Sequence, residues 1–306
     1  MYKILVASES FGYGAKKNDL LKLFKKYNYT PDFITIKKIG SRLKDYEAII
    51  IGTEEFTGEL FSKSLKLKAI IKYGIGTDNI DTIAAKKHNV EVLNLPSVNS
   101  ITVAEMAMGL LFASGRKIVE ADRFIRNKKW LKLIGLQIYG KTLGIIGTGS
   151  IGTILCGMVS GLKMKVLGYD LIRRKEFIGS GGKYVSFNSL LKKSDFISIH
   201  VPLNKKTYHL IGKKQLSEMK NNAILINVSR GSVVDEEALH YALKNNIIAG
   251  AALDVFEDES PEDNPIFKIE NLVCTPHIAA YTNETLRLMD LKCLEKLSTV
   301  LTSRDF

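Results

Sequence analysis

Short apolar runs alternate with amphipathic segments through the first hundred residues of the chain. The apolar runs are about four residues long, which suits strands, and the segments between them repeat apolar side chains at helical spacing. The pattern predicts strands at residues 4–7, 33–36, 48–51, 69–72 and 90–93, and helices at 17–27, 59–65 and 81–88. Regular alternation of strand and helix favours a parallel sheet.

A second series of the same kind begins at residue 142, with strands predicted at 142–146, 165–169, 196–200, 223–228, 249–253 and 272–275. Between the two series, residues 102–127 contain no proline and carry apolar side chains at helical spacing, which predicts one long linking helix. A last helix is predicted at residues 283–300. The fold class is therefore α/β, with two Rossmann-like, doubly wound parallel-sheet domains.

The net charge of +12 comes from 44 basic and 32 acidic residues. The lysines are scattered as pairs, with no arginine-rich arm and no basic strip interleaved with aromatic residues, so a nucleic-acid partner is not expected. The three cysteines, Cys156, Cys274 and Cys293, are too widely spaced for a disulfide framework or a metal cluster. We therefore expect no metal.

The longest apolar runs are strand-sized, far short of the roughly 20 residues that a membrane span requires. The chain begins with a strand-like segment from Tyr2 to Ala7, and lacks the order of charged, apolar and small residues typical of a signal peptide. We therefore expect no membrane partner and a cytoplasmic location.

The strongest motif is Gly147-Thr148-Gly149-Ser150-Ile151-Gly152, which follows a predicted strand and opens an apolar helical run. The first glycine permits a tight turn, the second lets the backbone approach a pyrophosphate, and the third allows close packing of the helix. Asp170 ends the next strand, 18 residues after Gly152. A carboxylate there accepts hydrogen bonds from ribose hydroxyls and repels a 2′-phosphate, which predicts NAD, although Arg173 and Arg174 could soften that preference.

Three further loops follow strands of the second series. They carry Arg230, the acidic run Glu257-Asp258-Glu259 and His277. Loops at the carboxyl ends of parallel strands are where such sheets bind ligands, so these side chains should face one crevice. By their chemistry, each of the three acidic residues is a candidate partner for the histidine.

At this point the sequence resembles the D-isomer-specific 2-hydroxyacid dehydrogenase family. The matching stretches, in the family's order, are residues 74–81, 103–105, 147–152, 200–203, 227–231, 250–259 and 275–278. The resemblance covers nearly the whole chain. It implies an NAD-dependent enzyme that interconverts a D-2-hydroxy acid and its 2-keto acid.

The resemblance also implies roles for particular residues. Arg230 would hold the substrate carboxylate and carbonyl, and His277 would exchange a proton with the carbonyl oxygen. Glu259 is chosen as the partner of His277 because the family's glutamate lies five residues after the aspartate that matches Asp254, and its carboxylate would favour the protonated imidazole. Hydride passes directly between the nicotinamide and the substrate, so no metal is needed.

The remaining site residues are also assigned through the resemblance. Cofactor binding is expected at Gly147, Gly149, Ser150, Ile151, Gly152, Asp170, Val201, Pro202, Thr207, Val228, Asp254 and Thr102, with Asp254 on the nicotinamide carboxamide. Substrate binding is expected at Tyr73, Gly74, Ile75, Gly76, Asn99 and Arg230. Many relatives carry arginine at the positions of Tyr73 and Ser150, so backbone donors would matter more here.

By the same resemblance, residues 1–98 with 284–306 form a flavodoxin-like substrate domain, residues 99–283 form the NAD domain, and the active site lies in the cleft between them. The linking helix region would form a homodimer. The expected substrate is 3-phosphoglycerate, at the first step of serine synthesis, because of the basic surplus and the similarity to phosphoglycerate dehydrogenases. The alternatives are glyoxylate, hydroxypyruvate or D-lactate as the small acid, an NAD-sensing corepressor-like binding protein, and an inactive relative.

Overall fold

The computed structural model describes residues 1–13, 15–259 and 264–303, and the chain divides into two compact units. Unit 1 comprises Met1–Asn99 and Tyr281–Phe306, and unit 2 comprises Ser100–Ala280. Unit 1 therefore ends one residue later and resumes three residues earlier than the substrate domain expected from the sequence. Each unit has its own parallel sheet and its own core.

Unit 1 contains a five-stranded sheet in which every neighbouring pair is parallel, in the order β2-β1-β3-β4-β5. The strands are β1 (Tyr2–Val6), β2 (Tyr29–Phe33), β3 (Ala48–Ile51), β4 (Ala69–Lys72) and β5 (Glu91–Leu93). The helices are α1 (Lys17–Lys26), α2 (Ile36–Ile39), α3 (Gly58–Lys63), α4 (Thr82–Lys87) and α12 (Asn283–Ser303), with a 3-10 helix η1 at Gly40–Asp45. This order is the flavodoxin-like doubly wound arrangement.

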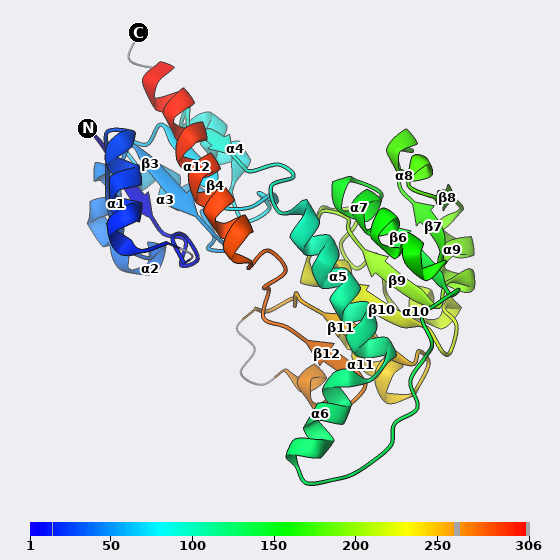
Figure 1. Cartoon of the computed structure of the whole chain (residues 1–306). Coiled ribbons are helices and arrows are strands. Elements are labelled where there is room, and N and C mark those ends of the chain that lie inside the picture. Colours follow the sequence, from blue (N-terminus) through cyan, green and yellow to red (C-terminus); the bar gives the residue numbers. More distant parts are fainter. Residues whose placement is uncertain (14, 260–263, 304–306) are drawn as a thin grey trace. The chain divides into compact units, whose positions relative to one another are not determined.

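Helices cover both faces of this sheet because successive strand residues point to opposite sides. On one face, Ile4 and Val6 of β1 pack with α1 and with α12, which lies beside β4 (Figure 1). On the other face, Leu5 packs with Phe61 of α3 and with Ala85 of α4. The last helix therefore returns to the first sheet and completes its core.

The strand expected at residues 33–36 is wrong. The second strand runs from Tyr29 to Phe33 and includes Pro31. Pro31 has no amide hydrogen, but β2 is at the edge of the sheet, where a missing donor costs little. Tyr29 is buried, and the apolar residues that follow Phe33 lead into α2.

Unit 2 contains a seven-stranded parallel sheet in the order β12-β11-β10-β9-β6-β7-β8. The strands are β6 (Thr142–Ile146), β7 (Lys165–Tyr169), β8 (Gly182–Tyr184), β9 (Phe196–Ile199), β10 (Ile224–Asn227), β11 (Gly250–Leu253) and β12 (Leu272–Cys274). The order reverses between β6 and β9, which is the switch point where doubly wound sheets bind nucleotides. The predicted fold class is confirmed, although the short edge strand β8 was not anticipated.

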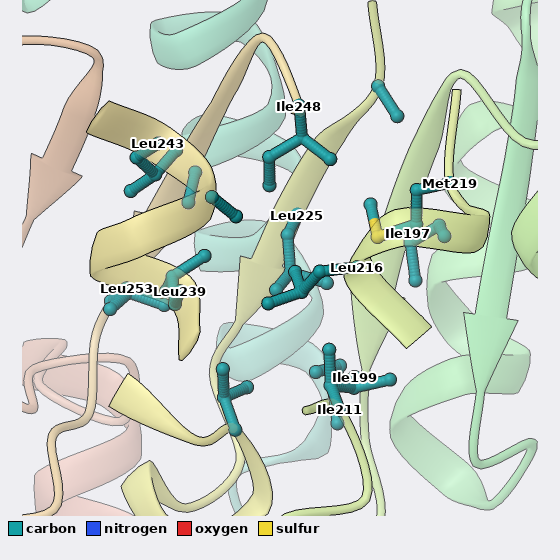
Figure 2. Close-up of a cluster of buried hydrophobic side chains, with 14 of the residues drawn as sticks. Ile197, Ile199, Ile211, Leu216, Met219, Leu225, Leu239, Leu243, Ile248 and Leu253 are labelled. Carbon is teal, nitrogen blue, oxygen red and sulfur yellow. The ribbon is translucent and has the colours of Figure 1, made fainter. Parts of the chain in front are cut away.

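The helices of unit 2 are α5 (Ser100–Gly115), α6 (Ile118–Arg126), α7 (Ser150–Met158), α8 (Lys175–Gly179), α9 (Phe187–Lys193), α10 (Lys213–Glu218) and α11 (Glu236–Lys244), with 3-10 helices at Val159–Leu162, Gly231–Val233 and Pro265–Lys268. Leu216 of α10 and Leu239 of α11 pack on one face of the sheet against Ile197 and Leu225 (Figure 2). Helices α5 and α7 cover the other face. The strands are thereby buried on both sides.

The single linking helix expected at residues 102–127 is two helices. The helix α5 ends at Gly115, and Lys117 has a left-handed backbone with φ of 52° before α6 begins. A left-handed residue cannot continue a right-handed helix. Among the described residues, no helix is both long and apolar enough to cross a membrane.

Candidate active site

The glycine loop follows β6 at the switch point of the unit 2 sheet. Gly147 has φ of 94°, and a Cβ on it would lie 2.6 Å from the His200 carbonyl carbon. A Cβ on Gly152 would lie 2.3 Å from the Gly147 oxygen, so α7 can approach the loop only with glycine there. A Cβ on Gly149 would meet no atom within 4 Å. This open backbone at the N-terminus of α7 fits a dinucleotide pyrophosphate.

Asp170 follows β7 and reaches the glycine loop directly. Its Oδ2 accepts from the Thr148 amide at 2.7 Å, and its Oδ1 accepts from the Ile172 amide at 3.1 Å. The Arg173 guanidinium lies over the ring of Tyr184, 5.7 Å from its centroid. The carboxylate therefore lies beside the loop where an adenosine ribose would be held, with a cation nearby.

The other expected cofactor residues lie around this loop or behind it. A Cβ on Gly147 would also approach the Val201 amide at 2.9 Å, and Thr207 Oγ1 donates to the Pro202 carbonyl at 2.6 Å, which closes the turn after β9. Ser150 is exposed and Ile151 half-buried at the start of α7, Val228 is buried after β10, and Thr102 is buried in α5. Asn99, which was expected to bind substrate, is the last residue of the first segment of unit 1.

His200 is part of the supporting structure of the loop. Burial lowers the pKa of its imidazole to about 3, and its Nε2 pairs with Ser198 Oγ at 2.8 Å. The ring is therefore neutral at physiological pH and is unsuited to carry a proton to a substrate.

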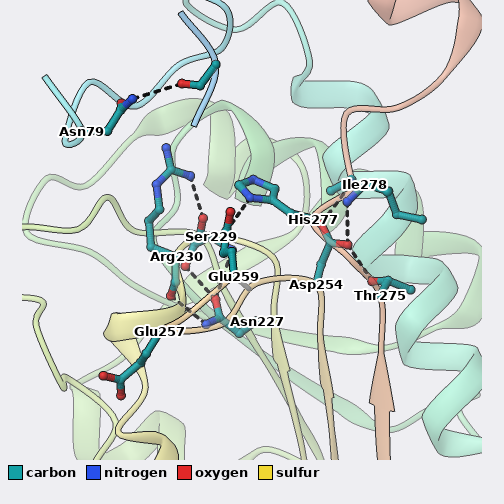
Figure 3. Close-up of polar contacts among 12 residues, drawn as sticks. Asn79, Asn227, Ser229, Arg230, Asp254, Glu257, Glu259, Thr275, His277 and Ile278 are labelled. Atoms are coloured by element: carbon teal, nitrogen blue, oxygen red, sulfur yellow. Dashed lines mark hydrogen bonds and ion pairs between the residues drawn. The ribbon is translucent and has the colours of Figure 1, made fainter. Parts of the chain in front are cut away.

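Arg230 projects from a turn that Asn227 builds at the end of β10. The Asn227 side chain is fully buried, accepts from the Ser229 amide at 3.0 Å and donates to the Arg230 carbonyl at 2.8 Å. Arg230 Nη1 donates to the Ser229 carbonyl at 2.8 Å. Figure 3 shows the Arg230 and His277 side chains extending to the same side of the loops.

At the next residue, Gly231, the turn that carries Arg230 (the arginine turn) meets the loop that carries Glu257, Asp258 and Glu259 (the acidic loop). A Cβ on it would lie 1.9 Å from the Phe256 carbonyl carbon and 2.4 Å from the Glu257 amide nitrogen. No side chain fits between these backbones. The loop that carries Arg230 and the loop that carries Glu259 are therefore in direct backbone contact.

His277 and Glu259 form a close pair of ionisable side chains at this edge of the sheet. His277 Nδ1 lies 2.6 Å from Glu259 Oε1, with 33% and 38% of the two side chains exposed. The remaining ring nitrogen, Nε2, is the atom that can exchange a proton with a substrate. A hollow of about 270 Å³ beside the pair is lined by Phe256, Phe267, Cys274 and Pro276 together with both side chains.

The backbone at His277 is left-handed, with φ of 52°, which is costly for a residue with a side chain. Asp254 stabilises it. The His277 amide donates to the Asp254 carbonyl at 2.7 Å, and the Asp254 carboxylate accepts from the Ile278 and Ala279 amides, each at 2.9 Å. Thr275 Oγ1 donates to the same carboxylate at 2.6 Å.

Asp254 is fully buried, and burial raises its pKa from the usual value of an aspartate. The sequence led us to expect a contact with the nicotinamide from this side chain. The structure shows that the Asp254 carboxylate holds the turn at His277. Its contact with the nicotinamide stays a prediction.

Glu257 makes contacts of its own. Its Oε1 lies 3.0 Å from His209 Nε2 and accepts from the Glu236 amide at 3.1 Å. Of the three acidic candidates, Glu259 is the one that the structure pairs with His277.

In unit 1, the expected substrate residues form a turn after β4. Gly74 has φ of 151°, its carbonyl accepts from the Leu95 amide at 2.8 Å, and the Ile75 carbonyl accepts from Asn94 Nδ2 at 2.7 Å. Among the described residues, the Ile75 and Gly76 amides have no hydrogen-bond partner. They are available to bind a carboxylate.

The Tyr73 side chain is directed into unit 1. It is 6% exposed, and its hydroxyl donates to Asp290 Oδ1 of α12 at 2.7 Å. Burial beside Asp290 raises the pKa of the Tyr73 phenol. Its hydroxyl therefore belongs to the core, and a substrate contact would come from the backbone.

The loop after β3 lies against this turn. Asn79 Nδ2 donates to the Glu54 carbonyl at 2.5 Å and to the Gly52 carbonyl at 3.1 Å, and buried Lys72 donates through Nζ to Gly52 and, at 2.9 Å, to Asn79 Oδ1. The loop then continues to Glu55, which is also acidic.

Sequence reasoning missed the residues that hold these loops in place. They are Asn227, Glu236, Asn264 and Asp290. Two of them carried a local signal: Glu236 is an acidic residue in a first helical turn, and Asn264 precedes Pro265 as the N-cap of a 3-10 helix. The contacts that Glu236, Asn264 and Asp290 make with distant segments carried none.

Comparisons with known proteins agree with this geometry. Residues 108–279 match the family model described as the NAD-binding domain of D-isomer-specific 2-hydroxyacid dehydrogenases. A glyoxylate reductase of Korarchaeum cryptofilum is 44% identical over 270 residues, which is 85% of this chain and 81% of the relative. A D-3-phosphoglycerate dehydrogenase of Methanocaldococcus jannaschii is 40% identical over 274 residues, 88% of this chain but only 52% of that protein.

Among solved structures, a D-lactate dehydrogenase of Aquifex aeolicus, in complex with NAD and lactic acid, superimposes with a TM-score of 0.87 at 27% identity. The match covers 98% of this chain and 96% of that one. The prediction of an enzyme with NAD as its cofactor is confirmed, and the corepressor-like and inactive alternatives find no support. This chain belongs to the D-isomer-specific 2-hydroxyacid dehydrogenases, and its second unit contains their NAD-binding domain.

Proposed function

We propose that this enzyme reduces glyoxylate, or a similarly small unphosphorylated 2-keto acid, with NADH. The observation that carries the proposal is the His277–Glu259 pair, 2.6 Å apart at the carboxyl edge of the NAD-domain sheet. A carboxylate at Nδ1 orients the imidazole and favours its protonated form, which is the form that a ketone reduction consumes.

In the proposed mechanism, the Arg230 guanidinium binds the substrate carboxylate and the carbonyl oxygen, and stabilises the negative charge that develops there. His277 Nε2 donates a proton to that oxygen, and Glu259 stabilises the imidazolium before transfer. In unit 1, the amides of Ile75 and Gly76 are the groups that we propose for carboxylate binding. Bound NADH supplies the hydride that reduces C2.

The choice of an unphosphorylated substrate departs from our expectation of 3-phosphoglycerate, which is not confirmed. Glyoxylate reductases match over most of their length, as in the Korarchaeum relative, whereas this chain spans about half of the phosphoglycerate dehydrogenase from Methanocaldococcus. The loop beside the Gly74 turn also carries Glu54 and Glu55, and the Glu54 carboxylate accepts from the Gly52 amide at 2.7 Å. If the Gly74 turn binds the substrate, as we propose, this negative charge disfavours a phosphate dianion.

The test is a comparison of kcat/KM with NADH for glyoxylate, hydroxypyruvate, pyruvate and phosphohydroxypyruvate at low and high salt. We expect glyoxylate or hydroxypyruvate to be preferred, with phosphohydroxypyruvate at least tenfold poorer. A preference of about tenfold or more for phosphohydroxypyruvate at low salt, reduced by screening, would restore the serine-pathway substrate.

We also propose that the chain forms a homodimer through α6 and the segment after it, and that it acts in the cytoplasm. No described side chain of α6 is buried, and Ile118, Val119 and Ile125 are exposed, as are Trp130 and Ile134. Exposed apolar side chains in such numbers are typical of an interface. Sedimentation of the wild-type chain should give a dimer at micromolar concentration, and Ile125→Asp should shift it towards a monomer. A wild-type monomer would contradict the proposal.

A further inference from the structure

The acidic loop is fastened to the start of α11 by a reciprocal pair of hydrogen bonds. The Glu257 amide donates to Glu236 Oε1 at 2.5 Å, and the Glu236 amide donates back to Glu257 Oε1 at 3.1 Å. Each glutamate therefore binds the backbone of the other. The partners are 21 residues apart in the sequence.

The second carboxylate oxygen of Glu236 binds Asn264, the first described residue after 260–263. Asn264 Nδ2 donates to Glu236 Oε2 at 2.8 Å, and Asn264 Oδ1 accepts from the Ile266 amide at 3.0 Å at the start of a 3-10 helix. One carboxylate thus binds both described segments that flank 260–263.

Two carboxylates in such proximity repel each other unless other groups compensate. Glu257 Oε1 receives an amide from the N-terminal turn of α11 and lies 3.0 Å from His209 Nε2, while Asp235 Oδ2 lies 3.9 Å from the other ring nitrogen of His209. Amide donors, the helix N-terminus and the imidazole offset the repulsion. Asp258 and Glu259 follow in the same loop and add further negative charge.

We propose that Glu236 is a positioning residue for the reaction. It acts by holding Glu257 and Asn264, so that Glu259, two residues after Glu257, stays within 2.6 Å of His277 Nδ1. We call Glu236, Glu257, Asn264 and His209 the loop clasp. This inference rests on the proposed role of Glu259 as the residue that orients His277.

The clasp predicts a specific defect when it is removed. In Glu236→Ala, the Glu259 carboxylate is no longer held at the imidazole, and a misplacement of about 1 Å in such a constellation costs up to about 100-fold in rate. We expect kcat for keto-acid reduction to fall by about 10- to 100-fold. The pH profile should shift to lower pH, because the protonated imidazole loses its carboxylate. NADH binding should change less than twofold, since the glycine loop is untouched.

The experiment compares Glu236→Ala, Glu236→Gln and Asn264→Ala with Glu259→Gln as reference and Glu237→Ala as control. Glu237 is the next residue of α11, is exposed and carries the same charge, so it reports the loss of charge alone. The pH dependence of kcat/KM is measured with the best 2-keto acid of the panel, together with the NADH dissociation constant and the melting temperature. Glu236→Gln keeps one acceptor oxygen, so its defect should be smaller than that of Glu236→Ala.

Each outcome separates this inference from the proposed function. If Glu259→Gln shifts the profile and folded Glu236→Ala does not, the clasp has no positioning role and the proposed function stands. If Glu259→Gln leaves the profile unchanged, Glu259 does not set the protonation of His277 and the inference falls with that role, while the proposed substrate is tested separately by the comparison of 2-keto acids. If Glu236→Ala does not bind NADH, Asn264→Ala becomes the test of the inference, because it removes only the hydrogen bond between Asn264 and Glu236. A shift in Asn264→Ala supports the inference, and a wild-type profile overturns it.

Discussion

Substitution of Gly231 by alanine tests whether the contact between the arginine turn and the acidic loop sets the geometry of catalysis. A Cβ there would lie 1.9 Å from the Phe256 carbonyl carbon, and real Cβ atoms essentially never approach within 3.0 Å, so the two backbones must separate by about 1.1 Å. Arg230 and Glu259 lie on opposite sides of this contact. A displacement of about 1 Å in an active site costs about 100-fold in rate, equivalent to about 3 kcal/mol in the barrier.

The assay measures kcat for glyoxylate reduction at saturating NADH, with NADH affinity from fluorescence titration as proof that the cofactor domain is folded. Gly157→Ala is the matched control, because Gly157 is exposed in α7 and a Cβ on it would meet no atom within 4 Å. That variant should keep wild-type kcat and gain up to about 1 kcal/mol of stability. If Gly231→Ala retains kcat within threefold, the contact does not control the relative position of Arg230 and Glu259.

Four further predictions follow from the same structure. His277→Ala should lower kcat by about two to four orders of magnitude and leave NADH binding intact, and a smaller loss would assign proton transfer to another group. Asp254→Asn should lower both kcat and the free energy of unfolding in urea, by about 1–3 kcal/mol, because an amide cannot accept from both the Ile278 and Ala279 sides; wild-type stability would contradict this. Burial raises the pKa of Asp290, so wild-type stability should decline as pH rises from about 4 through that raised pKa. The decline should be smaller in Asp290→Asn, because an amide does not ionise while its Oδ1 can still accept from Gly12 and Tyr73; an unchanged decline would contradict this. The kcat/KM with NADPH should be at least tenfold below that with NADH, and equal values would refute the reading of Asp170.

The sequence by itself determined the fold class and NAD as the cofactor, and it predicted which side chains would lie at the reacting edge of the sheet. These depend on local signals. Apolar runs of strand length alternate with amphipathic helices, and a glycine loop must stand between a strand and a helix to bind a pyrophosphate. Arg230 and His277 follow strands of one parallel sheet, and the carboxyl ends of parallel strands share an edge. Their grouping could therefore be predicted without coordinates.

Only the tertiary structure decided how those side chains are held. The second strand begins at Tyr29 because its place at the sheet edge tolerates Pro31, and edge position is a property of the whole sheet. The left-handed backbone of His277 depends on Asp254, more than 20 residues away, and the Glu259 loop depends on Glu236. Such hydrogen bonds join segments that are distant along the chain, so no periodicity or spacing encodes them. These hydrogen bonds form only when the packed strands bring the loops together, so they are known only from the tertiary structure.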